Sequence, residues 1–273
     1  ILVEASPVVL EAKATDQPNE QVVAITRQLT HVISVKGLAT GFAGQLVFLL
    51  INLAILSEIT NENQLNLRLS IALACVWVFI FSIVTFMRLK TRPGPDLPRG
   101  NSYCRHSLIG ARNTLRSFKH LTELGKYLIA YFIFSDGTST VAGAAIIFGQ
   151  EELNMNTLQI GIALIEVTIC GIVGSFFFRW LNEKCRIHSK TILLLNLFMM
   201  GLIPIYGLFA MTTVFEFYIA AGVFGFNTSS QQAFTRSIFA HYIPAGRESE
   251  YFSFYEISDK GTAWLGPLVI GLV

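Results

Sequence analysis

The first candidates for chemistry are two carboxylates that stand inside long apolar runs. Asp136 lies in the segment Ser135-Asp-Gly-Thr-Ser-Thr140, and on a helix Ser139 and Thr140 share its face. Glu166 is flanked by leucine, isoleucine and valine. At the middle of a membrane an ionised carboxylate costs at least about 2.5 kcal/mol, so it normally faces a cavity or a polar partner. We predict a substrate or proton pathway at these four residues.

Each carboxylate also has a plainer interpretation. Asp136 could be hydrogen-bonded to a neighbouring helix for structural reasons alone, and Gly137 could break the helix beside it. Glu166 could carry a proton, or it could remain a neutral, hydrogen-bonded group. The residues leave both pairs of alternatives open.

A second polar set lies where later apolar runs begin and end. Its members are Gln231, Gln232, Arg236, Glu256, Asp259 and Lys260. Neighbouring side chains on a helix point apart, so we expect Asp259 and Lys260 to find partners elsewhere rather than each other. We predict a gating or structural role for this set, and a solvated cap at the membrane interface is the alternative for the segment from Glu256 to Lys260.

Composition and missing motifs exclude several protein classes. Hydrophobic residues make up 52% of the 273 residues, and charged residues 14%, against roughly 25% in soluble domains. The net charge of +2 excludes a basic nucleic-acid binder. The sequence has no phosphate loop, zinc-protease helix or nucleophile elbow, and its four cysteines have no C-x-x-C spacing. We expect no enzyme, no metal site and no cofactor.

The apolar runs have the length of membrane-crossing helices. A helix needs about 20 mostly apolar residues to cross the hydrocarbon, and a two-residue alternation typical of barrels is absent. The predicted spans cover residues 41–57, 67–87, 124–148, 158–178, 191–210, 214–234 and an incomplete stretch from about 261 to 273. Because the last stretch stops midway, we expect a fragment of a longer all-α polytopic membrane protein.

The distribution of charge predicts an orientation. The segment 88–126 carries a net charge of +7, and the remainder of the chain sums to −5. Cytosolic loops are enriched in Lys and Arg, so residues 90–123 are predicted to be cytosolic, and alternation places residues 1–40 on the same side. Residues 105–122 have a helical pattern with a basic and an apolar face. This helix could lie on anionic lipid headgroups, or the segment could be an ordinary basic loop.

Three stretches resemble a known family. They are Phe134-Ser-Asp-Gly-Thr-Ser-Thr140 with Phe148-Gly-Gln-Glu-Glu-Leu-Asn-Met155, Gln231-Gln-Ala-Phe-Thr-Arg-Ser-Ile-Phe-Ala240 with the segment 250–267, and Ser34-Val-Lys-Gly-Leu-Ala-Thr-Gly-Phe-Ala-Gly44. All three are similar to segments of the vacuolar effluxer family, the autophagy-related fungal amino-acid effluxers of the major facilitator superfamily. The resemblance runs from about Ile33 over nearly the whole chain. Glu166 matches no motif of the family.

The resemblance implies a partial major facilitator fold, with about seven of twelve transmembrane helices. Residues 41–89 would be the last two helices of the N-terminal half, 90–123 the cytosolic central loop, and 124–273 a C-terminal half that stops before its last helix. It also implies a vacuolar membrane transporter that exports amino acids to the cytosol after autophagic degradation, by alternating access. Amino acids, protons and membrane lipids are the expected partners, and Asp259 and Lys260 the expected cytosolic gate.

Two rival functions stand beside the transporter that the resemblance implies. One is a membrane component of autophagic-body breakdown that transports nothing and acts as a scaffold or handles lipid. The other is a seven-helix receptor, suggested by the span count. The receptor requires an N-terminus outside the cytosol, which the distribution of Lys and Arg opposes.

Overall fold

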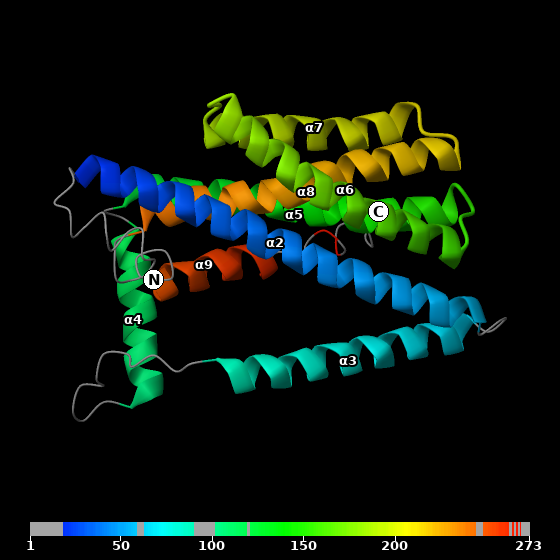
Figure 1. Cartoon of the computed structure of the whole chain (residues 1–273), viewed down its shortest axis with the longest axis horizontal. Coiled ribbons are helices and arrows are strands. Elements are labelled where there is room, and N and C mark those ends of the chain that lie inside the picture. The colour runs from blue at the N-terminus through cyan, green and yellow to red at the C-terminus, as the bar shows by residue number, and fades with distance from the viewer. Residues whose placement is uncertain are drawn as a thin grey trace.

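The computed structural model describes residues 19–58, 63–89, 102–118, 121–243 and 248–261, with single positions at 264, 266 and 268. Every regular element among these residues is a helix (Figure 1). The helices are α2 (Asn19–Glu58), α3 (Asn63–Arg88), α4 (Tyr103–Ser117), α5 (Thr122–Glu151), α6 (Thr157–Lys184), α7 (Ser189–Phe209), α8 (Val214–Tyr242) and α9 (Glu248–Lys260).

Five of these helices, α2, α3, α5, α6 and α7, are long and apolar enough to cross a membrane. The chain is therefore part of an all-α polytopic membrane protein. The sequence predicted seven spans, and two of them have a different outcome. The predicted span 214–234 lies within α8, which is long enough but too polar to meet the same criterion. Most of the incomplete span after 261 lies outside the described residues.

The polarity of α8 has a structural explanation. Its polar side chains are packed against protein rather than lipid, because α8 contacts α6, α7, α2 and α5. Asn227, Ser229, Ser230 and Thr235 are almost completely buried. Ser230 donates a hydrogen bond to Asn196 on α7 at 3.0 Å, and Ser229 hydrogen-bonds Ser175 on α6. Side-chain hydrogen bonds of this kind hold membrane helices together.

Glycines allow α6 and α8 to approach each other closely. A Cβ atom at Gly174 would overlap the carbonyl oxygen of Phe226, and one at Gly225 would overlap that of Val167. Each helix thus places a glycine against the backbone of the other. Small residues serve the same purpose at many helix contacts within membranes.

Capping side chains stabilise the first turns of α6 and α8, which lie at the same end of the bundle. Asn156 and Gln159 form a reciprocal capping box at the start of α6, and Thr213 and Glu216 form another at the start of α8. These side chains satisfy backbone N–H groups that the first helical turn leaves unpaired. The connections 152–156 and 210–213 can therefore be short, so α5, α6, α7 and α8 run alternately up and down.

Helix α4 lies crosswise to the long helices (Figure 1). It contacts α9, and Thr114 Oγ1 donates a hydrogen bond of 2.8 Å to Glu250 Oε2. The Phe118 ring packs edge-on against Tyr251 and Phe254. The predicted helix in this loop is thus present, although one of its faces packs on protein. Residues 90–101 lie outside the described part of the chain.

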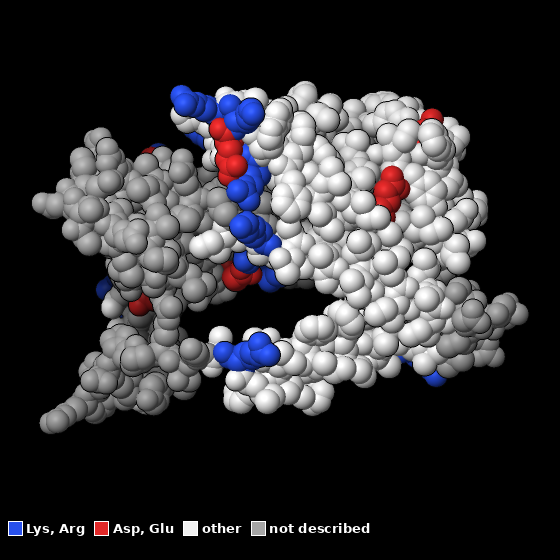
Figure 2. Space-filling model, viewed as in Figure 1, with Lys and Arg blue, Asp and Glu red and all other residues white. Residues whose placement is uncertain are grey.

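Charged side chains gather in a band across one end of the bundle (Figure 2). This end contains the C-terminal turns of α6 and α8, the start of α7, and α9. The opposite end carries acidic residues in the connection after α5 and at the start of α8. The side of the membrane that each end faces stays a prediction from the distribution of Lys and Arg.

Candidate functional site

The charged end of the bundle contains a cluster that joins α5 to α9. Tyr131 Oη and Ser135 Oγ, one turn apart on α5, each donate a hydrogen bond of 2.7 Å to Asp259 Oδ1 on α9. Lys260 Nζ lies 2.6 Å from Asp259 Oδ2. One carboxylate therefore collects donors from two helices that are distant in sequence.

The surroundings of Asp259 favour its ionised form. Burial raises the pKa of this carboxyl, but the hydrogen bonds from Lys260, Ser135 and Tyr131 outweigh burial and hold the pKa below its usual value. Asp259 therefore remains a charged acceptor at neutral pH. That charge is the shared acceptor of the two hydrogen bonds from α5.

The expectation that Asp259 and Lys260 do not pair is wrong. The Lys260 side chain is long and flexible, and 76% of it is exposed, so it reaches back to the preceding carboxylate at 2.6 Å. The rule that adjacent helical residues point apart describes their Cβ directions. It does not limit the end of a four-carbon side chain.

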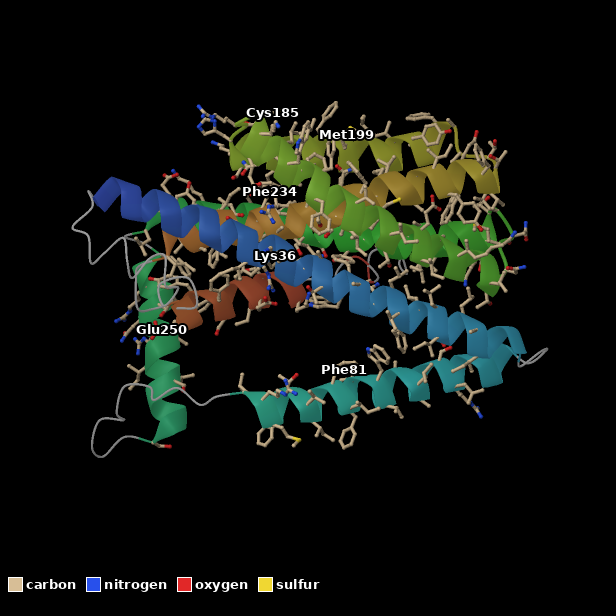
Figure 3. All side chains as sticks on the ribbon, in the orientation of Figure 1. Lys36, Phe81, Cys185, Met199, Phe234 and Glu250 are labelled. Atoms are coloured by element: carbon tan, nitrogen blue, oxygen red, sulfur yellow. The ribbon has the colours of Figure 1, made fainter. Side chains whose placement is uncertain are left out.

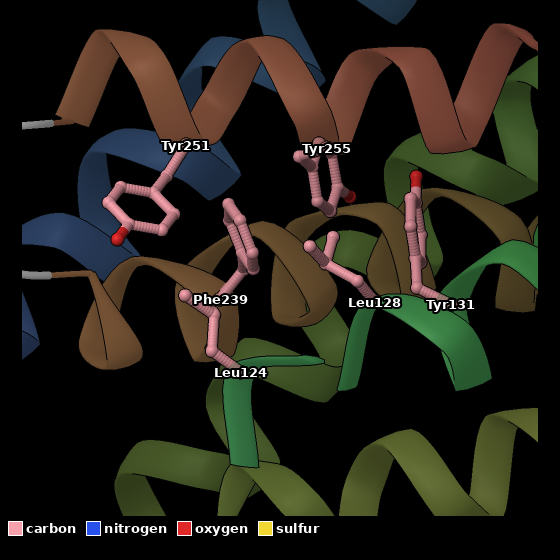
Figure 4. Close-up of a cluster of buried hydrophobic side chains, with 6 residues drawn as sticks. All are labelled: Leu124, Leu128, Tyr131, Phe239, Tyr251 and Tyr255. Atoms are coloured by element: carbon pink, nitrogen blue, oxygen red, sulfur yellow. The ribbon is translucent and has the colours of Figure 1, made fainter. Parts of the chain in front are cut away.

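Aromatic packing surrounds the cluster (Figure 4). The rings of Tyr131 and Tyr255 stack with centroids 4.3 Å apart, and Tyr255 and Tyr251 point from α9 toward α5 and α8. The buried cluster consists of Leu124, Leu128, Tyr131, Phe239, Tyr251 and Tyr255. Burying aromatic rings supplies much of the apolar stabilisation at such contacts. The polar cluster thus has a rigid apolar support on one side.

A second ion pair links α8 to α9. Arg236 Nη2 pairs with Glu256 Oε1, and the Arg236 guanidinium lies 5.9 Å from the centroid of the Tyr255 ring. Both side chains of the ion pair are 43% exposed. Water therefore screens the charges, and an ion pair of this exposure contributes little to stability.

This exposure predicts a small coupling energy. In a double-mutant cycle of Arg236→Gln and Glu256→Gln, we expect the two residues to be coupled by less than about 1 kcal/mol, as for other exposed ion pairs. Thermal unfolding of the detergent-solubilised intact protein measures it. A coupling above about 2 kcal/mol would contradict the assignment of a pair that opens easily.

A different group of polar residues lies deeper in the bundle. Asp136 is the fifteenth residue of the thirty in α5, and its Oδ1 atom is buried without a hydrogen-bond partner among the described residues. On α8, Gln231 Nε2 donates to Thr138 Oγ1 at 3.2 Å, while Gln231 Oε1 is buried and likewise unpaired. With Asn227 Oδ1 on α8, three buried acceptor oxygens therefore lack a donor among the residues that the structure describes.

The remaining predicted residues occupy separate places. Ser139 and Gln232 are exposed. Thr140 is next to Gly266, and a Cβ atom at Gly266 would overlap the Thr140 hydroxyl oxygen. Glu166 lies on α6 next to Gly222 of α8, away from the α5–α9 contact. The structure thus brings Arg236, Glu256, Asp259 and Lys260 together at one end, and it joins Gln231 to α5. It groups neither Ser139 nor Glu166 with them.

Sequence reasoning missed Tyr131, Ser135 and Thr138. A signal was present, because Tyr127, Tyr131, Ser135 and Thr138 recur at spacings of four, four and three along α5. Such spacing places polar atoms on one face of a helix. Tyr127 Oη also donates to α8, at 2.9 Å from the Thr235 carbonyl oxygen.

The whole chain matches one known protein family. The family model described as "Vacuole effluxer Atg22 like" matches residues 1–273. The chain belongs to the Atg22-like vacuole effluxer family. The resemblance of the three sequence stretches to vacuolar effluxers is thereby confirmed. No solved structure matches the chain.

Several fungal members of the Atg22-like family align with most of the chain. Autophagy-related protein 22-1 of Aspergillus niger is 27% identical and covers 90% of the chain, with 43% of its own length aligned. Autophagy-related protein 22-1 of Aspergillus clavatus is 28% identical, with 97% and 47% covered. Autophagy-related protein 22 of Neurospora crassa is 26% identical, with 94% and 38% covered. The chain spans less than half the length of each relative.

Proposed function

We propose that the chain is part of a vacuolar membrane transporter that moves amino acids from the vacuole to the cytosol after autophagic degradation. Membership of the Atg22-like vacuole effluxer family supports a transport role. Five membrane-crossing helices supply the setting for it. Transport proceeds by alternating access in this proposal, with the α5–α8–α9 cluster acting as the cytosolic gate.

One observation carries the assignment of the substrate class. Asp136 Oδ1 and Gln231 Oε1 are buried acceptors that lack a donor among the described residues. Unpaired buried polar atoms are costly, so a ligand that supplies donors gains affinity from them. The ammonium group of an amino acid carries three donors and a positive charge. Asp136 then binds the ammonium group or a coupled proton, and Gln231 accepts a further hydrogen bond.

The gate in this proposal consists of contacts that form at one membrane face. Arg236–Glu256 is exposed and weak, whereas the Asp259 contacts with Tyr131 and Ser135 are half-buried and stronger. Opening requires both sets to separate, which moves α9 away from α5 and α8. The distribution of Lys and Arg predicts that residues 1–40 and 90–123 are cytosolic, and in this proposal the gate therefore faces the cytosol.

The test replaces Asp136 with asparagine in the intact protein. An interaction with a charged group contributes about 1.5–3 kcal/mol, so Asp136→Asn should slow leucine efflux roughly tenfold or more. The measurement is the release of preloaded radiolabelled leucine from isolated vacuoles that contain matched amounts of protein.

Glu152→Gln is the matched control, because Glu152 is an exposed carboxylate in the connection after α5. Its efflux should remain within about twofold of the wild type, as expected for a surface substitution. Equal rates for Asp136→Asn and Glu152→Gln at equal protein abundance would refute the role given to Asp136.

A further inference from the structure

A groove lies between α6, α7 and α8 on the outside of the bundle. It encloses about 510 Å³, and its walls include Cys170 and Phe177 of α6, Leu195 and Met199 of α7, and Ile219 and Phe226 of α8. Figure 3 marks Met199 on α7. Phe177, Leu195 and Ile219 are between 43% and 52% exposed, so the groove opens outward. Because α6 and α7 are membrane-crossing helices, it opens toward lipid.

A carboxyl group lies at one end of this groove. Glu166 is one helical turn before Cys170, and its Oε1 atom would be 3.1 Å from a Cβ atom at Gly222. Gly222 and Cys170 both line the groove. The absence of a side chain at Gly222 therefore leaves space beside the carboxyl group.

Among the residues that the structure describes, no hydrogen bond or ion pair is found for Glu166. An unpaired carboxyl group within a membrane span is costly, and such groups usually face a polar partner. Gly222, which lies beside the carboxyl group, is part of the wall of the lipid-facing groove. A partner that arrives from the membrane would supply the missing hydrogen bond.

The chemistry of the walls restricts that partner. None of the described residues lining the groove is basic, so nothing there would bind a phosphate headgroup. From Cys170 to Phe178 the groove follows α6 for about 12 Å at 1.5 Å per residue. An elongated apolar molecule with one hydroxyl donor fits this arrangement, and a rigid molecule loses less conformational entropy than a flexible acyl chain.

We propose that this groove binds a membrane lipid of the sterol class. The sterol hydroxyl donates a hydrogen bond to the Glu166 carboxyl group, and the ring system lies between α6 and α7 over Gly222 and Phe226. The site is separate from the α5–α9 cluster and from Asp136. It would hold α7 against α6, whose direct contact is otherwise slight compared with that of α6 and α8.

The test uses the intact protein in lipid nanodiscs with a photoreactive, clickable sterol as the probe. Mass spectrometry of the labelled peptides should place the label on α6, α7 and α8 around Cys170, Met199 and Ile219. Unlabelled sterol should compete, whereas its 3-deoxy analogue, which has no oxygen to pair with the carboxyl group, should compete at least tenfold less well.

Three variants separate this site from general contact with lipid. Glu166→Leu removes the acceptor and should lower labelling about tenfold, whereas Glu166→Gln keeps an acceptor and should retain at least a third of it. Gly222→Leu should block labelling by filling the groove. Leu208→Phe, in the other large apolar cavity, is the control and should leave labelling unchanged.

Size-exclusion chromatography shows that each variant is folded before labelling is compared. Equal labelling of Glu166→Leu and the wild type would overturn the proposal, as would equal competition by the deoxy analogue. Labelling spread evenly over all lipid-facing helices would also overturn it. A crosslink between two copies at Cys170 in place of sterol labelling would assign the groove to self-association instead.

Discussion

Replacing Gly225 with alanine is expected to lower the unfolding free energy by about 3 kcal/mol, near the upper end of the usual cost of overpacking. The added Cβ atom would overlap the carbonyl oxygen of Val167 on α6. A backbone oxygen cannot rotate away as a side chain can, so the two helices must separate. Gly174→Ala should have a similar effect, because its Cβ atom would meet the Phe226 carbonyl oxygen.

The same substitution elsewhere provides the control. Gly201 lies in α7, and no atom is within 4 Å of the place where its Cβ atom would be. There alanine removes backbone freedom from the unfolded chain and should be neutral or stabilising by up to about 1 kcal/mol. Thermal unfolding of the three variants in detergent distinguishes them. Equal melting temperatures for Gly225→Ala and Gly201→Ala would show that the α6–α8 contact tolerates expansion.

Replacing Asp259 with leucine is the second change with a large expected effect. Tyr131 and Ser135 would lose their shared acceptor, and each buried donor left unpaired costs about 1–3 kcal/mol. We expect α9 to detach from α5 while the α6–α7–α8 part of the bundle remains folded. Hydrogen exchange of the amides of α9 should increase at least tenfold, with little change in α6 and α8.

Asp259→Asn is the milder variant, because its amide oxygen can still accept from Tyr131 and Ser135. It should show an intermediate increase in exchange. Unchanged exchange in Asp259→Leu would mean that the aromatic cluster alone holds α9 in place.

The lowered pKa of Asp259 gives this contact a pH dependence of known sign. A carboxyl group whose pKa is lower in the folded protein stabilises it above the unfolded pKa of about 3.9. That contribution disappears as the pH falls through the lower, folded value. The contact of α9 with α5 should therefore persist throughout the neutral range, and its loss should require strong acid.

The bounds of a helix could be predicted well from the sequence where the apolar run and the helix have the same length. The predicted span 191–210 and the observed α7, Ser189–Phe209, nearly coincide. The ends of a helix were predicted less well where the helix extends beyond its apolar run. α2 begins at Asn19, although its apolar run begins near residue 41, and α8 continues to Tyr242, beyond the predicted end at 234. Backbone hydrogen bonding extends both helices, and hydropathy does not detect it.

The candidate site was predictable only in part. Charge in an apolar sequence singled out Arg236, Glu256 and Asp259, which the structure places together. Tyr131 and Ser135 were not found, because they are ordinary residues whose importance depends on a contact with a residue more than 120 positions away. One sequence without the fold contains no information about that pairing.

The buried polar side chains of α8 also affect how this helix is inserted into the membrane. A helix that is not apolar enough to cross a membrane by itself gains little free energy when it moves from the translocon into the bilayer without a partner helix. The connection 210–213 is short, so α8 emerges from the ribosome directly after α7, a strongly apolar helix. We expect α7 and α8 to enter the bilayer as a hairpin, with α6 already present to accept the glycine face of α8. The order of synthesis would then match the order in which the polar groups of α8 find their partners.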